Sequence, residues 1–417
     1  MIARRRIAVY FNVGWGGGRR WLHDVVSRLA QYHDLDLYCL DRESIGTQFP
    51  DVREFSGEES VTVRFRDLPR MPARVLKPLD APSLFADFFR FDRASRAMAA
   101  RIDAAGYDLA FASIGGYTEA PLVLRHLKTP AAYYCHEPMR QVYEPRIPRP
   151  YPRNPAVASL RRLWHRLYYG TVMRRWDGQG TRRASLVLAN SQYTADYIGR
   201  AYGVASVVNY AGVDADAFTP GGEPRERFVL SVGEMMARKG FDWAVRAIGA
   251  LPAWDRPPLV IVSNNIEVSE RRFVEKVAAE QGVALDIRER ISDDELKELY
   301  RTAGAFLYTP HLEPLGLAAI EAMACGTPVV AVREAGPAET ITDGVTGFLC
   351  ERDADELAAA VGRLLADPDL AKRMGAAARD DVVRRWTCDR SAEELARLLA
   401  DQVEFEERGD SGEGLSA

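Results

Sequence analysis

The sequence has few cysteines and no long uncharged apolar run, and each shortage excludes a class of protein. The five cysteines among 417 residues are widely spaced without a Cys-x-x-Cys pair, so neither a disulfide framework nor a zinc cage is expected. The most apolar stretch, LGLAAIEAMACGTPVVAV, contains Glu321 and is broken by Gly326-Thr327-Pro328, so it is unsuitable as a membrane span. The cysteines are Cys39, Cys135, Cys325, Cys350 and Cys388. We expect reduced thiols and no crossing of a membrane.

The N-terminus lacks the pattern of an export signal. Three arginines precede an apolar run, but the run ends at Asn12, short of the ~7–15 apolar residues that such a signal needs. We therefore expect RIAVYFN to be a first β-strand and the protein to be cytoplasmic.

Charge is divided unevenly along the chain, although the net charge is only −4. Residues 1–200 hold 31 Lys and Arg against 20 Asp and Glu, whereas the remainder holds 24 against 39. Eleven arginines lie within residues 140–183, where the acidic residues are Glu144 and Asp177. The split predicts two halves with different partners. Anionic lipid, a phosphate-bearing acceptor or nucleic acid would suit the arginine cluster, and so would a plain solvated surface.

Short aliphatic runs alternate with segments of helical periodicity. Several runs are apolar throughout, as are strands whose sheet is covered by helices on both faces. The pattern predicts an α/β protein with two doubly wound domains in tandem. The expected strands are RIAVYFN, DLDLYCL, VTVRF, DLAFAS, AAYYC and SLVLAN in the first half, then FVLSVG, LVIVS, VALDI, AFLY and PVVAV.

The domain boundary is expected near residues 213–226, where Pro, Gly and charged residues gather between two strands. An N-terminal domain would then cover 1–215 and a C-terminal domain 216–387. A helix at about 388–403, amphipathic and capped by Asp389, could pack back on the N-terminal domain. Residues 404–417 lack periodicity and predict a flexible tail.

A glycine-rich segment, FNVGWGGGRRWLHDVVSRLA, follows the first strand. Gly16, Gly17 and Gly18 would let backbone amides approach a phosphate or a hydroxyl-rich ligand at a helix start. The spacing differs from the dinucleotide G-x-G-x-x-G. A tight turn without a ligand would have the same sequence.

A second candidate site is FVLSVGEMMARKGFDW. Here Arg238-Lys239-Gly240 leads from the end of a strand into a helix. Lysine beside glycine at this place suits a phosphate in the crevice of an open α/β sheet, although a surface lysine gives the same pattern.

The third candidate site is YTPHLEPLGLAAIEAMACGTPVVAV. Pro314 and Gly316 predict a loop and then a helix start whose amides face an anion. Glu321 lies in the second turn of this otherwise apolar helix, and a buried carboxylate needs partners. A sugar nucleotide would supply them: ribose hydroxyls for Glu321, sugar hydroxyls for Glu313, and diphosphate for the amides and Lys239. The alternative is an internal salt bridge for Glu321 and a solvated Glu313.

The order and spacing of these segments resemble glycosyltransferase family 4, the retaining, nucleotide-sugar-dependent enzymes with the GT-B fold. The resemblance covers most of the chain. It implies two Rossmann-like domains that face each other across a cleft, with the acceptor bound by the N-terminal and the donor by the C-terminal domain. It rests on the Gly-rich loop, YYCHEPMR at 133–140, LVLANSQYTADYI at 186–198, VDADAFTP at 213–220, the RKG loop, and the glutamates eight apart in HLEPLGLAAIEAMACGTPVV.

The resemblance implies roles for single residues. Glu313 would contact hydroxyls of the donor sugar and Glu321 the ribose. His136 would lie beside the donor sugar and the reaction centre. The diphosphate would be held by Lys239 and the amides of Gly316 and Leu317, and the phosphate and acceptor would be bordered by Gly16 and Gly17.

Two details depart from the family pattern. Many relatives carry arginine after the glycine that corresponds to Gly233, whereas this chain has Glu234, so Arg238 could take over phosphate binding. Ser263-Asn264-Asn265 stands where a glycine-rich turn is common, which leaves recognition of the base open.

The implied function is retaining transfer of a hexose from a nucleotide diphosphate sugar to a hydroxyl acceptor. YCHEPMR is similar to segments of mannosyl-transferring relatives, which favours GDP-mannose over a UDP-sugar. No metal or other cofactor and no nucleic acid partner are expected. The expected acceptor is a lipid-linked saccharide or other glycan precursor of a surface polysaccharide. The alternatives are a nucleotide-sugar epimerase of the same architecture and, because of Glu234, a non-catalytic nucleotide-sugar-binding relative.

Residues 156–176 place aromatic and leucine side chains at helical spacing with arginines between them. Such a helix could lie on an anionic membrane, which predicts peripheral attachment to the inner face of the plasma membrane. Packing of the same stripe against its own domain is the alternative. The stripe consists of Leu160, Leu163, Trp164, Leu167 and Tyr168.

Overall fold

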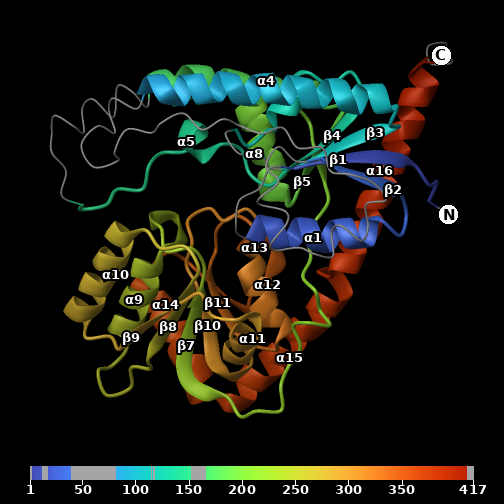
Figure 1. Cartoon of the computed structure of the whole chain (residues 1–417). Helices are drawn as coiled ribbons and strands as arrows, with labels where there is room; N and C mark the ends of the chain where they lie inside the picture. Colours follow the sequence, from blue (N-terminus) through green and yellow to red (C-terminus); the bar gives the residue numbers. More distant parts are fainter. Residues whose placement is uncertain are drawn as a thin grey trace. The chain divides into compact units, whose positions relative to one another are not determined.

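The chain folds into two compact α/β units (Figure 1). The computed structural model describes residues 2–11, 17–38, 81–113, 115, 118–151 and 166–410. Unit 1 contains the described residues up to Arg146, those from 166 to Tyr210, and those from Ser391 onward. Unit 2 contains Ala211–Arg390 and also the short segment Ile147–Tyr151, which in sequence lies between two parts of unit 1.

Unit 1 is built on a parallel six-stranded sheet with the order β2-β1-β3-β4-β5-β6. Its strands are β1 (Arg6–Tyr10), β2 (Asp34–Tyr38), β3 (Leu109–Ala112), β4 (Ala131–Cys135), β5 (Leu186–Ala189) and β6 (Val207–Val208). Strands β3 and β4 are buried along their whole length, as expected for a sheet with helices on both faces. Ala8 and Tyr10 of β1 pack in one core with Phe91 and Met98 of α4.

The helices of unit 1 lie on both sides of this sheet, with α1 and α4 on opposite faces (Figure 1). They are α1 (Gly17–Leu29), α4 (Ala81–Ala105), α5 (Arg140–Tyr143), α7 (Arg174–Arg183) and α8 (Gln192–Tyr202), with the 3-10 turn η1 (Leu122–Arg125) and the π-helical η2 (Tyr168–Met173). The described part of the expected helix at 156–176 is thus helical, whereas Leu160, Leu163 and Trp164 lie outside the described residues.

Unit 2 repeats the design with the strand order β12-β11-β10-β7-β8-β9, again all parallel. Its strands are β7 (Glu226–Val232), β8 (Leu259–Ser263), β9 (Leu285–Glu289), β10 (Ala303–Tyr308), β11 (Val329–Val332) and β12 (Gly347–Cys350). Its helices are η3 (Ala237–Lys239), α9 (Phe241–Ala250), α10 (Val268–Gln281), α11 (Asp293–Thr302), α12 (Leu317–Ala324), α13 (Pro337–Thr340), α14 (Ala354–Ala366) and α15 (Pro368–Arg385). Two doubly wound domains, as predicted from the sequence, are confirmed.

The last helix, α16 (Cys388–Asp410), belongs to unit 1 from Ser391 onward. The His33 imidazole accepts a hydrogen bond from the Arg5 amide, so its other nitrogen, 3.0 Å from the Ala396 carbonyl oxygen, is the donor to α16. The sequence places a tail from residue 404, but the helix continues to Asp410. Side-chain pairs at helical spacing accompany the extension, with Arg408 3.3 Å from Glu404.

Two further expectations concern thiols and membranes. The four cysteines among the described residues are buried free thiols, and Cys39 lies outside that part of the chain. Within the described ranges, no helix combines the length and hydropathy that crossing a membrane requires.

Candidate active site

The order of the strands in unit 2 reverses between β10 and β7. β7 is followed along the chain by strands on one side of it, and β10 by strands on the other side. Ligands of open parallel sheets bind beyond the carboxyl ends of the strands at such a point. The loops that leave β7 and β10 carry the second and third sites expected from the sequence.

The loop after β7 turns through η3 and Gly240 into α9. Gly240 has φ +64°, and a Cβ there would lie 2.1 Å from the Thr309 carbonyl oxygen, so only glycine fits. The Thr309 hydroxyl donates to the Gly240 carbonyl at 2.8 Å, and the His311 amide donates to the Arg238 carbonyl at 2.7 Å. The Arg238-Lys239-Gly240 turn is therefore bonded to the loop after β10.

Lys239 and Glu313 meet at this junction. The lysine Nζ lies 2.8 and 3.0 Å from the two carboxylate oxygens, and the side chains are only 13% and 14% exposed. Glu313 is thus paired and largely enclosed rather than solvated. The sequence predicted both residues for one ligand, and the structure brings them together.

Helix α12 begins at Leu317, directly after Gly316, whose φ is +94°. Gly336 packs directly against the chain before this helix start, because a Cβ at Gly336 would lie 2.3 Å from the Leu315 Cα. The first amides of a helix have no partner within it, so they point outward from its N-terminal end. This places the amides of Gly316 and Leu317 beside the loop that carries Glu313.

Glu321 lies on the one partly exposed face of α12, together with Leu317 and Ala318. Its carboxylate accepts a hydrogen bond of 2.9 Å from the Tyr300 hydroxyl. Burial, and next the nearby carboxylate, raises the pKa of Tyr300 well above its usual value, so this hydroxyl stays protonated and donates. The carboxylate of this partly exposed residue is thus held by a buried hydroxyl.

Glu234, which departs from the family pattern, pairs with Arg238. The two side chains approach to 3.0 Å and are each 30% exposed. Arg238 therefore lies on the same turn as Lys239 with its charge partly balanced. This arrangement keeps a guanidinium near the place that an arginine after Gly233 would occupy.

His136 in unit 1 follows β4 and is held by side chains from other elements. Its ring lies 4.5 Å from that of Trp21 of α1 in an edge-on contact, and 4.9 Å from that of Tyr134. Its Nε2 is 3.2 Å from the hydroxyl of Ser113, which follows β3. Burial lowers the pKa of His136 to about 3, so the ring is neutral at physiological pH.

A buried carboxylate, Asp177 of α7, ties together the loops that follow β3 and β4. It accepts hydrogen bonds from the Ala120 amide at 2.8 Å and from the Tyr202 hydroxyl at 2.5 Å. That hydroxyl also accepts one of 3.3 Å from the amide of Met139, three residues beyond His136. Burial raises the pKa of Asp177 to about 6.

Some sequence expectations receive no test from the structure. Gly16 lies outside the described residues, and Gly17 begins α1.

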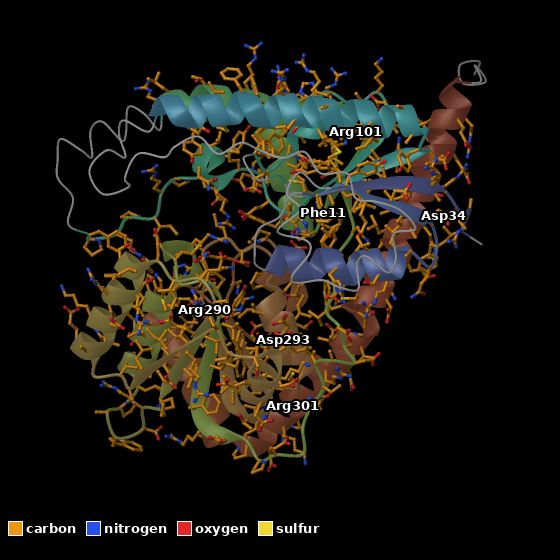
Figure 2. All side chains as sticks on the ribbon, in the orientation of Figure 1. Phe11, Asp34, Arg101, Arg290, Asp293 and Arg301 are labelled. Atoms are coloured by element: carbon orange, nitrogen blue, oxygen red, sulfur yellow. The ribbon has the colours of Figure 1, made fainter. Side chains whose placement is uncertain are left out.

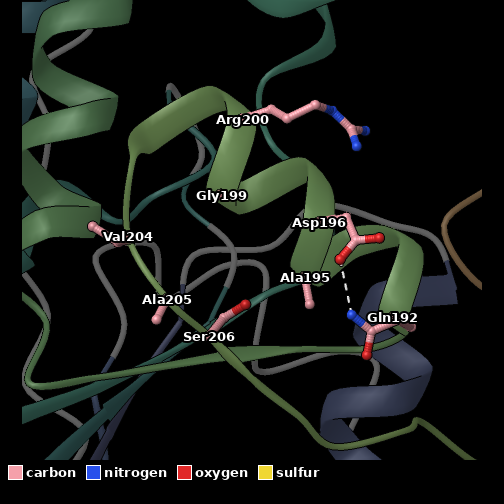
Figure 3. A pocket seen from close by; sticks show the side chains of 8 residues that line it. All are labelled: Gln192, Ala195, Asp196, Gly199, Arg200, Val204, Ala205 and Ser206. Carbon is pink, nitrogen blue, oxygen red and sulfur yellow. Dashed lines mark hydrogen bonds between the residues drawn. The ribbon is translucent and has the colours of Figure 1, made fainter.

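A pocket of about 530 Å³ lies along α8, where Gln192 donates to Asp196 at 2.8 Å (Figure 3). It includes none of the predicted site residues. The described residues contain no group of three or more side chains suited to a metal ion.

Comparison with known families matches two consecutive parts of the chain. The description Glycosyltransferase Family 4 matches residues 15–217, and Glycosyl transferases group 1 matches residues 214–381. The chain belongs to the group 1 glycosyltransferases of family 4. The predicted resemblance is confirmed.

Individual members of this family resemble the chain over about half of its length. A GDP-mannose-dependent alpha-(1-6)-phosphatidylinositol monomannoside mannosyltransferase of Mycolicibacterium smegmatis is 32% identical over 247 residues, 53% of this chain and 63% of the relative. The alpha-1,3/1,6-mannosyltransferase ALG2 of Homo sapiens is 27% identical over 247 residues, 52% of this chain and 59% of the relative. The chain thus matches less than two thirds of the length of these relatives.

A solved structure shows the same fold over nearly the whole chain. The sucrose-phosphate synthase of Thermosynechococcus elongatus superposes with a TM-score of 0.69 at 20% identity, covering 96% of this chain and 100% of that one. This likeness, with the two parallel sheets, identifies the two-domain GT-B fold.

Proposed function

We propose that this glycosyltransferase moves a hexosyl group, with mannose favoured, from a nucleoside diphosphate sugar to a hydroxyl acceptor with retention of configuration. The observation that carries the proposal is the Lys239–Glu313 pair at the strand-order reversal of unit 2. The two residues lie on loops that are hydrogen-bonded to each other. The loop with Glu313 leads directly into α12, which carries Glu321. A cation, helix amides and two carboxylates match a diphosphate and the hydroxyls on both sides of it.

The pair offers a way for the donor to enter. In the structure Lys239 and Glu313 neutralise each other. The diphosphate would take the ammonium group of Lys239, together with the amides of Gly316 and Leu317, and the sugar hydroxyls would take the freed carboxylate of Glu313. Glu321, oriented by Tyr300, would accept from the ribose hydroxyls, and Arg238 would add positive charge once it turns from Glu234.

In the transfer itself, the bond between the anomeric carbon and the diphosphate oxygen breaks while the acceptor oxygen bonds to the same face of that carbon. The acceptor proton passes to an oxygen of the departing diphosphate. Lys239 and the N-terminus of α12 would stabilise the negative charge that grows there, and no cofactor is required. Because the pKa of His136 is about 3, we assign it to hydrogen bonding with the donor sugar and not to proton transfer.

For the donor we propose GDP-mannose, with a UDP-sugar as the other candidate. The names of two relatives support mannosyl transfer, and one of them specifies GDP-mannose. For the acceptor we propose a lipid-linked saccharide, since the Mycolicibacterium enzyme is named for a phosphatidylinositol monomannoside.

We also propose that unit 1 binds peripherally to the cytoplasmic face of an anionic membrane. We propose no nucleic acid partner. Arg96 of α4 and Arg175 and Arg183 of α7 are exposed, and all three act electrostatically on Arg125 of η1. Nitrogen-tipped side chains project from α4 (Figure 2). Phe89 of the same helix is 57% exposed. We call Arg96, Arg125, Arg175 and Arg183 the arginine surface.

The test begins with the thermal stability of the full chain in the presence of GDP, UDP, ADP or TDP. A ligand that binds only the folded protein stabilises it by about 2.7 kcal/mol at a hundred times its Kd, so GDP should raise Tm most. Mannose transfer from GDP-α-mannose should then give an α-linked product by NMR. A β-linked product refutes retention, and no Tm shift with any diphosphate refutes the donor site. Sugar isomerised without an acceptor would indicate an epimerase.

A further inference from the structure

The segment Ile147–Tyr151 brings one arginine into unit 2. The Arg149 guanidinium donates to both oxygens of Glu270 at 3.0–3.2 Å and to Asp242 at 2.8 Å. The side chains of Arg149 and Asp242 are each 6% exposed and that of Glu270 is fully buried. The Tyr151 hydroxyl also donates to Glu270. A segment of five residues thus supplies the partners of two buried carboxylates.

Arg149 also reaches the backbone of the turn that carries Lys239. Its Nη2 donates to the Ala237 carbonyl at 3.0 Å. Ala237 is the first residue of η3, and Asp242 lies in the first turn of α9 directly after Gly240. The guanidinium therefore contacts the chain on both sides of Lys239.

The opposite side of this turn is bonded to the loop after β10, through Thr309 and His311. With Arg149 on one side and the loop after β10 on the other, hydrogen bonds from two directions hold the backbone of the Lys239 turn. Lysine could not replace it, because one ammonium group cannot supply the planar set of donors that serves Glu270, Asp242 and Ala237 together.

We propose that Arg149 is a positioning residue for the donor diphosphate: it fixes the Lys239 turn in the conformation that binds the phosphates. The inference rests on the proposed function of this site. It means that a residue from the stretch between the two parts of unit 1, thirteen positions after His136, sets donor affinity in unit 2.

The test compares Arg149→Lys with wild type in the full chain, by calorimetric binding of GDP and of guanosine well below the Tm of each protein. We expect GDP affinity to fall about tenfold, because the turn loses a charge-assisted hydrogen bond, and guanosine affinity to change less than twofold. General loosening of unit 2 would weaken both ligands alike. The KM for donor should rise in parallel while kcat stays within about twofold.

The matched control is Arg256→Lys. Arg256 donates to the carbonyls of Gly249, Leu251 and Gln281 near the other end of α9, so its loss should lower Tm without changing GDP affinity. If Arg149→Lys does not fold, the neutral variant Arg149→Met/Asp242→Asn/Glu270→Gln removes all three charges together and should show the same selective loss of GDP affinity.

The outcomes separate the two proposals. Unchanged GDP affinity in the folded Arg149 variants, or an equal loss for GDP and guanosine, overturns this inference alone. A wild-type chain that binds neither GDP nor UDP, ADP or TDP overturns the proposed function, and this inference with it.

Discussion

The proposed donor site gives a physical reason for the Lys239–Glu313 pair that stability alone does not. Both side chains are almost enclosed, so each loses most of its hydration when the chain folds. The attraction between such partners roughly offsets that cost, and apolar residues of similar size often stabilise a fold as well. A charged ligand that binds the ammonium group of Lys239 and the carboxylate of Glu313 would account for the presence of both residues.

The two glutamates of the site should respond differently to removal of their charge. Glu321→Gln should raise the donor KM about tenfold with kcat within about twofold, because a ribose contact is made in the ground state and the transition state alike. Glu313→Gln should lower kcat about tenfold, since in the proposed site it holds the sugar that reacts. Steady-state kinetics with varied donor concentration separates the two effects.

Glu298→Gln provides the control for these variants. Glu298 is an exposed glutamate of α11, two residues before Tyr300, and should leave both constants unchanged. Identical kinetics for the Glu321 and Glu313 variants and wild type would remove both residues from the donor site.

The sequence motifs singled out individual residues, but not the partners that the fold gives them. Lys239, Glu313 and Glu321 were expected from local spacing, although the ion pair between the first two was not. Arg149 was counted in the basic cluster at 140–183, but the structure buries it against Glu270, 121 positions away. Ser113 and Trp21 gave no signal, because only the sheet order places them beside His136.

At the scale of elements, the apolar runs predicted the strands well. The runs predicted in the described part of the chain correspond to β1–β5 and β7–β11, whereas VTVRF lies outside it. Two strands were missed, β6 and β12. Both are at an edge of a sheet: β6 has only two residues, and β12, GFLC, offers an apolar run of only three residues after its glycine, below the roughly four that a strand pattern needs.

Two glycine variants should distinguish a collision that distorts the Lys239 turn from the backbone strain of a positive φ alone. Gly344→Ala places a side chain at φ +73° with open space around it, so it should lose roughly 1–2 kcal/mol of unfolding free energy. Gly240→Ala, at φ +64°, adds the collision with the Thr309 carbonyl. It should lose more stability than Gly344→Ala.

Only Gly240→Ala should also weaken GDP, because the collision moves the turn that carries Lys239. Urea unfolding and calorimetry on both variants measure the two quantities. Equal losses of stability with unchanged GDP affinity would show that the turn tolerates displacement.

At the scale of the whole molecule, the sequence predicted two domains and a last helix that returns to the first of them, but not every segment that each domain contains. The Pro- and Gly-rich stretch at 213–226 marks one connection. The part of α16 from Ser391 belongs to unit 1, the domain on which the sequence led us to expect a C-terminal helix, whereas no compositional change marks the segment Ile147–Tyr151, which belongs to unit 2. Their assignment depends on long-range contacts such as Arg149–Glu270 and His33–Ala396.

The uneven charge of the chain leads to a prediction about its location. The basic excess of the first half is partly used internally, since Arg140 pairs with Glu137 and Glu144. The arginine surface is different, because its exposed arginines act electrostatically on Arg125, whose own carboxylate partner is Asp92. Leu167, just before η2, is also 52% exposed.

The full chain should therefore sediment with vesicles that contain anionic phospholipid and not with neutral phosphatidylcholine vesicles. Each arginine near a charged bilayer contributes about 1 kcal/mol, so Arg96→Gln/Arg175→Gln/Arg183→Gln should weaken binding by roughly two orders of magnitude. The control, Arg227→Gln/Arg271→Gln/Arg288→Gln, removes the same charge from surface pairs of unit 2 and should bind as wild type does. Equal weakening in both variants would mean that net charge acts without a defined surface. Undiminished binding of the first variant would exclude the arginine surface as the contact and leave its arginines as solvated charges.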